Sequence, residues 1–295
     1  MRIGTFSDGS VRRVAVERDE AWWLLASAGG DERTVILNAL ADPDGAMRHA
    51  GAAPLPAGFR PAMPYLPARD PFCLGKNFRA HAEEFSRFSG DAEAVPPAPI
   101  VFTKSTAALC GPYDPLMVDT EVAEALDYEA ELVAVIGRSG SAIAVADALD
   151  HVAGYSVLND TTARDLQRIH AQWYLGKSLP GATPWGPAVV TPDELEPFAE
   201  RRIGSTVNGE ERQDAQLGQM IFSVADAIAS ISQVITLRPG DLIAMGTPAG
   251  VGVGFDPPRF LGDGDEVCCW VEGIGNLRNR VVVGRPVRAV AAVAE

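Results

Sequence analysis

Short apolar runs separated by turn residues make up the first part of the chain. Residues 2–6 and 11–17 are rich in apolar side chains and flank the turn Ser7-Asp8-Gly9-Ser10, a pattern that predicts two strands. Residues 22–26 predict a third strand, and the apolar spacing of residues 34–40 predicts a helix. The pattern therefore indicates a small α/β unit at the beginning of the chain.

A proline-rich segment follows this unit. Six prolines fall between residues 54 and 71, at positions 54, 56, 61, 64, 67 and 71. Because proline fixes φ and has no backbone N–H, the segment can sustain neither a helix nor a central strand, and it predicts an extended linker. We expect a small N-terminal domain with its linker at residues 1–70 and a catalytic domain at residues 71–295.

Beyond the linker, strand and helix patterns mix without regular alternation. Strands are predicted at residues 72–74, 100–102, 126–136, 155–158, 241–245, 267–271 and 280–283, and helices at residues 78–88, 146–152, 163–170 and 220–237. Asn208-Gly209 within residues 202–212 is a strong hairpin signal. A doubly wound parallel sheet requires repeated strand–helix–strand units, so the pattern favours a β-rich α+β domain.

Composition and charge narrow the functional class. The 295 residues are 47% hydrophobic and 22% charged, which is typical of a globular protein and excludes extensive disorder. The net charge of -14 repels nucleic-acid phosphates, so we expect no nucleic-acid partner. We also expect no membrane association and a cytoplasmic location, because no stretch could span a bilayer and residues 1–10 lack the apolar core of a signal peptide. An enzyme for small acids would need a metal ion and a few basic side chains to reverse this negative field locally.

Several common sites have no counterpart in the sequence. The four cysteines form no C-x-x-C pair, and we interpret them as reduced core thiols; they are Cys73, Cys110, Cys268 and Cys269. No G-x-S-x-G, H-E-x-x-H or P-loop motif is present. The glycines at positions 246, 250, 252 and 254 do not fit G-x-G-x-x-G, and they predict a turn-rich loop that brings backbone amides near a ligand.

Three acidic residues follow or lie on neighbouring predicted strands. Glu129 and Glu131 alternate along one strand and point to the same face, and Asp160 follows the next strand. Carboxylates on one face repel each other unless they are solvated, protonated or bridged by a cation. The pattern fits either a solvated strand face or a site for a hard cation such as Mg²⁺ or Mn²⁺, which prefers oxygen ligands.

A histidine and a glutamate can meet on the predicted helix at residues 78–88. His81 and Glu84 are three residues apart and share a helix face, whereas Glu83 lies away from both. The pair can be a surface ion pair, or a dyad in which the carboxylate orients the imidazole as a general base. Gly75, Ser89 and Gly90 flank the helix, so it could move as a lid.

Six segments taken together resemble the fumarylacetoacetate hydrolase family over residues 72–283. In chain order they are Gly75-Lys76-Asn77-Phe78 with His81, Phe102-Thr103-Lys104-Ser105, Asp127-Tyr128-Glu129-Ala130-Glu131-Leu132, residues 159–167, Gly176-Lys177-Ser178, and residues 246–252. Each segment alone is a weak signal, whereas all six in this order are specific.

The resemblance implies a fold and a set of site residues. The expected catalytic domain is a mixed β-sandwich roll behind a small N-terminal α/β domain, and the expected assembly is a homodimer. The resemblance implies Mg²⁺ or Mn²⁺ at Glu129, Glu131 and Asp160, and catalytic roles for His81, Glu84 and Lys177. It implies substrate contacts for Lys76, Lys104, Gln167 and Thr247, while Arg164 could form a structural ion pair or contact the ligand.

The resemblance also implies a reaction on a small anionic 2-oxo acid. The intact His81–Glu84 pair favours metal-dependent hydrolysis of a C–C bond in a 2,4-dioxo acid of the acylpyruvate type, which releases pyruvate through an enolate that the metal stabilises. The alternatives are an oxaloacetate decarboxylase or tautomerase, a 2-oxo acid isomerase or hydratase, and a non-catalytic relative that binds metal or ligand.

Overall fold

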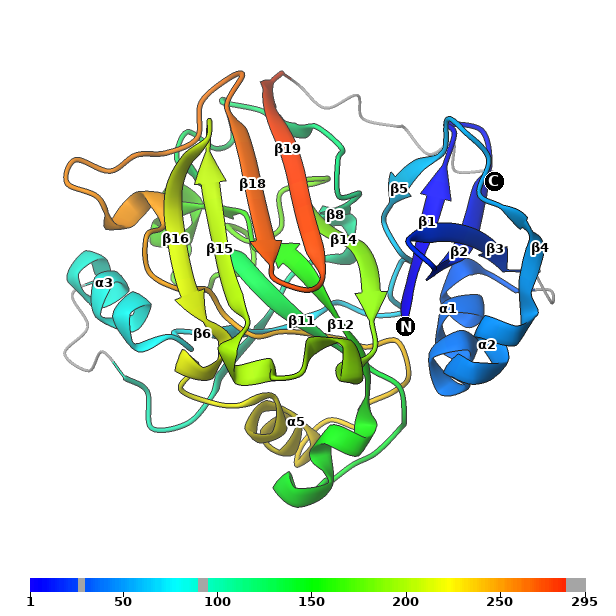
Figure 1. Ribbon diagram of the computed structural model, residues 1–295. Helices are drawn as coiled ribbons and strands as arrows, with labels where there is room; N and C mark the ends of the chain where they lie inside the picture. The colour runs from blue at the N-terminus through cyan, green and yellow to red at the C-terminus, as the bar shows by residue number, and fades with distance from the viewer. Residues whose placement is uncertain (26–29, 90–94, 285–295) are drawn as a thin grey trace, which may run out of the picture.

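The computed structural model describes residues 1–25, 30–89 and 95–284, without the side chains of residues 49–52 and 87–89. The N-terminal part contains five strands and two helices, drawn in blue in Figure 1. They are β1 (Arg2–Ser7), β2 (Arg12–Arg18), β3 (Ala21–Leu25), α1 (Glu32–Ala41), α2 (Pro43–His49), β4 (Ala50–Pro54) and β5 (Arg60–Ala62). The three predicted strands and the predicted helix are confirmed, although Ala26, the last residue of the third predicted strand, lies outside the described residues. Helix α2 and strand β4 were not predicted, and strand β5 lies within the segment expected to be a linker.

A large mixed sheet runs through the whole molecule. Its central strands are β6 (Phe72–Gly75), β7 (Ile100–Thr103), β11 (Ala130–Ile136), β12 (Val152–Asn159), β14 (Thr183–Val190) and β17 (Leu242–Ala244). The strand order is β4-β3-β2-β1-β14-β12-β11-β17-β6-β7, with β5 beside β1 and the short β8 (Leu109–Cys110) beside β14. The N-terminal strands therefore extend the sheet that carries the rest of the fold, because β1 pairs directly with β14.

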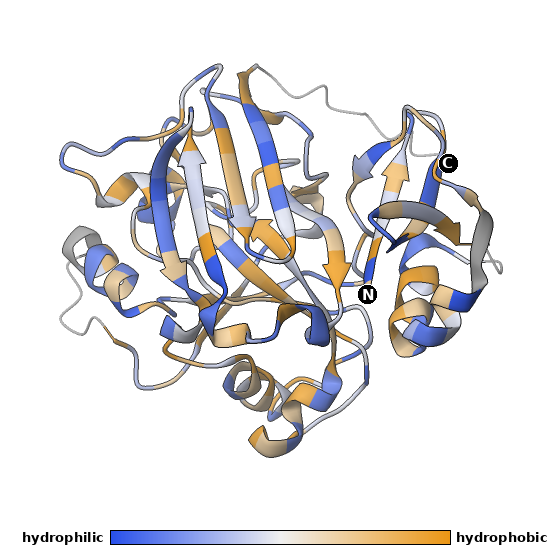
Figure 2. Cartoon of the chain, viewed as in Figure 1, coloured by the Kyte–Doolittle hydropathy of each residue, from blue (hydrophilic) through white to orange (hydrophobic). Residues whose placement is uncertain are grey.

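A second sheet packs against the first. It has the order β16-β15-β18-β19-β9, and its strands are β9 (Leu116–Val118), β15 (Arg202–Val207), β16 (Glu210–Gln216), β18 (Glu266–Val271) and β19 (Gly275–Val283). Asn208 and Gly209 form the predicted hairpin turn, both with positive φ. Hydrophilic and hydrophobic residues alternate along β19 in Figure 2, as expected for a strand with one face in the core.

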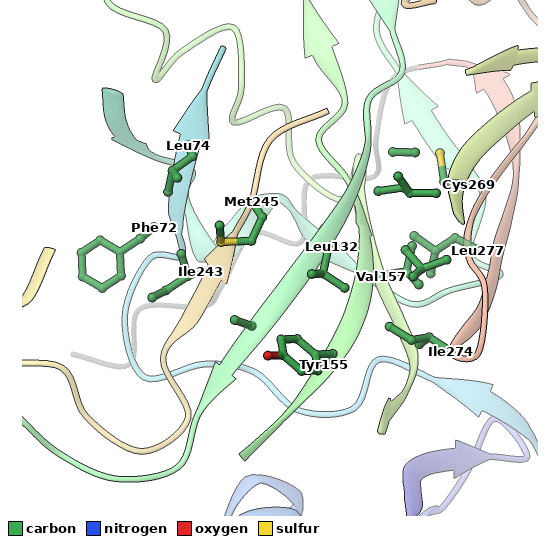
Figure 3. Packing of buried hydrophobic residues seen from close by; sticks show 14 of the residues in the cluster. Phe72, Leu74, Leu132, Tyr155, Val157, Ile243, Met245, Cys269, Ile274 and Leu277 are labelled. Carbon is green, nitrogen blue, oxygen red and sulfur yellow. The ribbon is translucent and has the colours of Figure 1, made fainter. Parts of the chain in front are cut away.

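The main hydrophobic core lies between the two sheets. Leu132 and Val157 of the large sheet and Cys269 and Leu277 of the second sheet are buried in one cluster, shown in Figure 3. On the other face of β11, Val133 and Val135 join Ile3 and the helix α1 residue Ile36 in a second cluster. Strand β11 is therefore buried on both faces, which gives Glu131, its second residue, a rigid support.

The remaining elements are short. They are α3 (Arg79–Ser89), β10 (Leu126–Asp127), β13 (Thr162–Ala163), α4 (Arg164–Ile169), α5 (Val224–Ser232) and six 3₁₀ turns: η1 (Thr106–Ala108), η2 (Val145–His151), η3 (Pro192–Leu195), η4 (Phe198–Glu200), η5 (Leu217–Gln219) and η6 (Gly252–Gly254). No helix among the described residues is long and apolar enough to cross a bilayer.

The β-rich α+β fold class is confirmed, and some element predictions need correction. The predicted strand at residues 126–136 breaks after Asp127, and the predicted helix at residues 220–237 is helical only at Val224–Ser232. Strand β14 was not predicted. Cys73 and Cys269 are buried as expected, but Cys110 and Cys268 are only half-buried; all four are free thiols. The division at residue 70 stays a prediction, and residues 285–295 of the second unit lie outside the described part.

Candidate active site

Three buried carboxylates converge where β11 and β12 lie side by side. Ala130 pairs with Asn159, and the Asp160 N–H donates to the Glu129 carbonyl at 2.8 Å, so the register places Asp160 next to the beginning of β11. One carboxylate oxygen from each of Glu129, Glu131 and Asp160 lies within 4.8 Å of the others. The side-by-side arrangement predicted for Glu129 and Glu131 is therefore present, and the solvated-face alternative is wrong, because all three residues are at most 4% exposed.

Basic side chains pair with these carboxylates. Lys177 Nζ donates to Glu129 Oε2 at 2.6 Å and to Asp160 Oδ2 at 2.7 Å, so its ammonium group lies between two of the three acids. Arg164 donates to Glu129 Oε1 at 2.6 Å and to Asp127 Oδ2 at 2.9 Å, and Lys104 donates to Asp160 and to the Thr161 carbonyl. The cluster thus sets four buried carboxylates against three buried cations: Asp127, Glu129, Glu131 and Asp160 against Lys104, Arg164 and Lys177.

The pKa values of the cluster follow from this imbalance. Burial alone would raise the pKa of Glu129, but Lys177 and Arg164 outweigh it and lower this pKa to about 2. Burial raises the pKa of Glu131 well above its usual value, and the negative charges of Asp160 and Glu129 raise it further. Burial would lower the pKa of Lys177, but Asp160 and Glu129 raise it, so the amine stays charged.

The donor set fits a divalent cation. An excess of one negative charge in a buried cluster is unfavourable unless a proton or a cation neutralises it. Glu131 holds this excess, because it accepts a hydrogen bond from the Gly246 N–H at 3.0 Å and, among the described residues, no basic side chain forms an ion pair with it. Hard divalent ions prefer oxygen ligands, and the three carboxylates offer oxygen atoms only. The residues Glu129, Glu131 and Asp160 can therefore hold such an ion.

The predicted His81–Glu84 pair forms on helix α3. His81 Nδ1 lies 3.2 Å from Glu84 Oε2, and both side chains are buried, which excludes a surface ion pair. The Glu84 carboxylate also accepts from the Gly250 N–H, at 3.2 Å to Oε1 and 3.3 Å to Oε2. A Cβ at Gly254 would lie 1.9 Å from Glu84 Oε1, so the glycine-rich loop around η6 approaches the dyad as only glycine allows. Figure 1 shows α3 next to this orange loop.

One cavity connects His81 of the dyad to two of the three carboxylates, Glu129 and Glu131. Its lining includes His81, Glu129, Glu131 and Lys177, together with the predicted substrate contacts Lys76, Gln167 and Thr247. Lys76 ends β6 with a φ of 55°, a left-handed conformation that is rare for a side chain larger than glycine and that occurs at functional sites.

Lys104 occupies a different place from the other predicted contacts. It is completely buried behind Asp160 and is not part of the cavity lining. Its bonds to Asp160 and Thr161 suit a residue that orients a carboxylate better than one that contacts substrate. Arg164 forms the structural ion pairs that were one of its two expected roles, and it also lines the cavity, so its contact with a ligand stays a prediction.

Comparison with known proteins identifies the family. The family model described as Fumarylacetoacetate (FAA) hydrolase C-terminal matches residues 71–282. The chain belongs to the fumarylacetoacetate hydrolase family. It is 44% identical over 215 residues to "Oxaloacetate tautomerase YisK" from Bacillus subtilis (73% of this chain, 70% of the relative). It is 41% identical over 242 residues to "Oxaloacetate tautomerase FAHD2A, mitochondrial" from Bos taurus (80% of this chain, 75% of the relative).

Solved structures of the family have the same fold. A fumarylacetoacetate hydrolase from psychrophilic Exiguobacterium antarcticum superposes with a TM-score of 0.83 at 36% identity, over 96% of this chain and 100% of that one. A maleylpyruvate hydrolase from Sphingobium superposes with a TM-score of 0.78 at 27% identity, over 96% and 100%. Family membership makes the chain an enzyme of a group whose named members include hydrolases, isomerases and tautomerases.

In this family member, two site residues escaped the sequence analysis. Asp127 accepts from Arg164 and from the N–H groups of Gly252 and Val253, so it joins the arginine to the glycine-rich loop. Gln213 of β16 donates to Thr247 Oγ1 at 2.7 Å and accepts from the Ala130 N–H at 3.0 Å. These partners are far apart in sequence, so no local pattern could reveal them.

The scarcity of lysine in the sequence is a further signal that points to the site. The chain contains 25 basic residues, of which only three are lysines, and all three are buried at this site: Lys76, Lys104 and Lys177. Arginine supplies every other basic position. A compact ammonium group is therefore placed only where it meets the carboxylates or the cavity.

Proposed function

We propose that the chain catalyses the keto–enol tautomerisation of oxaloacetate or a closely related 2-oxo dicarboxylic acid. The observation that carries the proposal is one cavity lined by His81 of the histidine–glutamate pair and by Glu129 and Glu131, two of the three convergent carboxylates. The names of the two relatives above support this reaction, since both are oxaloacetate tautomerases. They favour the tautomerase alternative of the sequence analysis over C–C bond hydrolysis, its first choice.

The proposed cofactor is Mg²⁺ or Mn²⁺, held by Glu129, Glu131 and Asp160. When bound, the cation supplies a positive charge that stabilises negative charge on the 2-oxo oxygen of the substrate. Arg164 and Lys104 hold Glu129 and Asp160 through buried ion pairs, so the ligand oxygens keep their positions before a cation arrives.

His81 is the proposed group for proton transfer. As a carboxylate, Glu84 accepts a hydrogen bond from the Nδ1–H group of His81. The lone pair on Nε2 is then free to take a proton from C3 of the keto form. The enolate oxygen then takes a proton from water to give the enol. In the reverse direction, the enol hydroxyl loses its proton to water and the protonated Nε2 returns a proton to C3. The Gly250 N–H donates to Glu84 and fixes the plane of its carboxylate, so it also fixes the imidazole.

Lys177, Lys76, Gln167 and Thr247 are the proposed substrate contacts. Lys177 is positively charged beside Glu129 and Asp160 and can approach the 2-oxo acid end, whereas Lys76 lies 5.2 Å above the Phe85 ring and can approach a second carboxylate. Two ammonium groups on one cavity favour a dicarboxylic acid in a chain of net charge -14. The homodimer and the cytoplasmic location stay predictions.

Hydrolysis of an acylpyruvate is a second candidate, and the buried His81–Glu84 pair favours it because the same base could deprotonate water. The two reactions differ in their products. Tautomerisation moves one proton and releases no fragment, whereas hydrolysis of a 2,4-dioxo acid releases pyruvate.

The experiment follows the ultraviolet absorbance of enol-oxaloacetate and, in parallel, pyruvate release from acylpyruvates. We expect the purified chain with Mg²⁺ to accelerate loss of the enol absorbance, and EDTA to abolish the acceleration. Glu84→Gln should lower the rate by about 10²–10⁴-fold, because a neutral amide cannot stabilise the protonated imidazole as the carboxylate does. Glu83→Gln on the same helix is the matched control and should keep the wild-type rate, since Glu83 is exposed. Full activity in EDTA, or pyruvate release alone, would contradict the proposal.

A further inference from the structure

Aromatic side chains form a continuous wall along the cavity. Phe102 lies 5.3 Å from Lys177 Nζ, Trp173 packs edge-on against Phe102 at 5.2 Å, and Phe85 packs edge-on against Trp173 at 5.8 Å. Lys76 Nζ then lies 5.2 Å from the Phe85 ring. The wall therefore extends from the lysine beside the carboxylates to the lysine at the end of β6, and Trp173 is its central member.

Trp173 separates the cavity from solvent. It lines the cavity and is only half-buried, so one part of the indole contacts the interior while another part remains accessible. The Lys177 N–H donates to the Trp173 carbonyl at 2.9 Å, so one turn of chain carries both the indole and the catalytic lysine.

The indole is held in place by three different elements. It lies directly on the backbone of β6, because a Cβ at Gly75 would be 2.5 Å from its Cζ3 atom. Phe102 on β7 and Phe85 on α3 meet it in T-shaped contacts. Two of these contacts, with Gly75 and Phe102, come from strands of the large sheet, and the third comes from the helix that carries the dyad.

We propose that Trp173 determines the substrate length that the cavity accepts. The carboxylate and 2-oxo group of an acid face the acidic cluster, and the remaining carbon atoms face the aromatic wall. The indole stands in the middle of this wall and limits the space beside it, so the cavity takes a short 2-oxo acid with its terminal group near Lys76 and excludes longer acyl chains. The inference rests on the substrate class of the proposed function, and it adds the residue that selects within this class.

The experiment measures binding of a homologous series rather than turnover. Dissociation constants of pyruvate, 2-oxobutanoate, 2-oxopentanoate and 2-oxohexanoate are determined by calorimetry in saturating Mg²⁺. The readout is the ratio of the constant for 2-oxohexanoate to that for pyruvate. We expect Trp173→Ala to lower this ratio about tenfold or more, because each methylene that an apolar pocket accepts or rejects changes binding by about 10–200-fold. Trp173→Phe, which keeps a smaller ring, should lower it less.

Tyr174→Ala is the matched control. Tyr174 is the next residue, is 40% exposed and donates to Asp70 Oδ2 at 3.4 Å, and it does not line the cavity. The ratio of the dissociation constants for 2-oxohexanoate and pyruvate should be the same in Tyr174→Ala as in the wild type. A change in this control would assign selectivity to the loop as a whole and overturn the role of the indole.

Other outcomes separate the inference from the proposed function. An unchanged ratio in both Trp173 variants, or equal weakening of every acid, overturns the inference alone, because a purely structural role weakens all ligands alike. A shifted ratio in a protein without tautomerase activity supports the inference and contradicts the proposed reaction. A wild-type protein that binds no 2-oxo acid in Mg²⁺ overturns both. If Trp173→Ala does not fold, the ratio measured for Trp173→Phe decides.

Discussion

At the scale of single residues, Lys177 is the most consequential charge in the site. Its ammonium group lies between Glu129 and Asp160, two of the three carboxylates that can hold a cation. A divalent ion held by the three acids would therefore compete with this ammonium group for two of them. The lysine neutralises these two carboxylates in the structure, and a cation that took over this charge would free the lysine for substrate.

This arrangement predicts how Lys177→Met behaves. The variant leaves two buried carboxylates without their shared partner, so the metal-free protein should lose about 3–5 kcal/mol of unfolding free energy. Mg²⁺ should then raise the melting temperature more in the variant than in the wild type, because the cation restores the missing positive charge. Thermal unfolding with and without Mg²⁺ measures both effects.

Arg202→Met is the control for this comparison, since Arg202 pairs with Asp214 on the surface. Its response to Mg²⁺ should match the wild type. An equal Mg²⁺ effect in Lys177→Met and wild type would show that the lysine and the cation do not share ligands.

Glu131 predicts a pH dependence of stability in the metal-free protein. Its folded-state pKa is raised above the usual 4.5 by burial and by Asp160 and Glu129, so its contribution is fully present below about pH 4.5 and is lost as pH rises toward the raised value. Denaturant unfolding of wild type and Glu131→Gln in EDTA, at several pH values, measures it. The stability of wild type relative to Glu131→Gln should fall with rising pH. A constant difference between them would contradict the raised pKa.

At the scale of elements, the dyad depends on contact between α3 and the glycine-rich loop. Gly254→Ala places a Cβ 1.9 Å from Glu84 Oε1 and 2.2 Å from Cδ, so α3 or the carboxylate must move away. We expect activity to fall by about 10²–10⁴-fold through loss of the oriented base, while metal binding stays close to wild type. Enol-oxaloacetate turnover and Mg²⁺ titration measure the two properties separately.

Gly262→Ala is the matched control in the same region, because the nearest atom to its added Cβ would be Asp265 Oδ2 at an ordinary 3.7 Å. It should keep wild-type activity. Wild-type activity in Gly254→Ala would mean that the contact between the loop and Glu84 does not position the dyad.

The elements also show what the sequence could and could not predict. Strands with alternating or continuous apolar runs, such as β1, β11 and β18, follow from periodicity. Strand β14 could not be predicted, because Pro184, Gly186 and Pro187 lie within it and proline normally excludes a central strand. The structure accommodates them through an irregular register with β12.

The candidate site also contains residues that the sequence could predict and residues that it could not. Spacing and motif order predicted that Glu129, Glu131 and Asp160 lie close together, and the structure confirms this. Helical spacing predicted that His81 and Glu84 are in contact, which is also confirmed. Trp173 and Gln213 act through contacts between distant segments: Trp173 lies on Gly75, and Gln213 reaches Thr247 from the second sheet. Such contacts depend on how the sheets pack, which no single stretch of sequence encodes.

At the scale of the whole molecule, the N-terminal strands are part of the large sheet. Arg2 and Ile3 pair with Val190 and Val189 of β14, and Ile3 is fully buried in the cluster that includes Val133 of β11. A continuous sheet and a shared core couple the stability of the N-terminal part to that of the catalytic part.

This coupling predicts that Ile3→Ala destabilises the entire chain. We expect a loss of about 2–5 kcal/mol of unfolding free energy, in a single cooperative transition. Denaturant unfolding followed by near-ultraviolet circular dichroism and by loss of activity should give coincident curves. Val11→Ala, at a 38% exposed position, is the control and should change stability little. Two separated transitions would instead indicate that residues 1–70 and 71–295 unfold independently.

The confinement of all three lysines to the site has a practical consequence. In the folded protein Lys76, Lys104 and Lys177 are at most 7% exposed, and the Met1 amine is paired with Thr191 and Glu194. Amine-directed labels such as succinimidyl esters therefore meet almost no reactive surface. Acylation of Lys76 or Lys177 in the folded chain must pass through the active-site cavity that both residues line, so its rate reports how often that cavity opens.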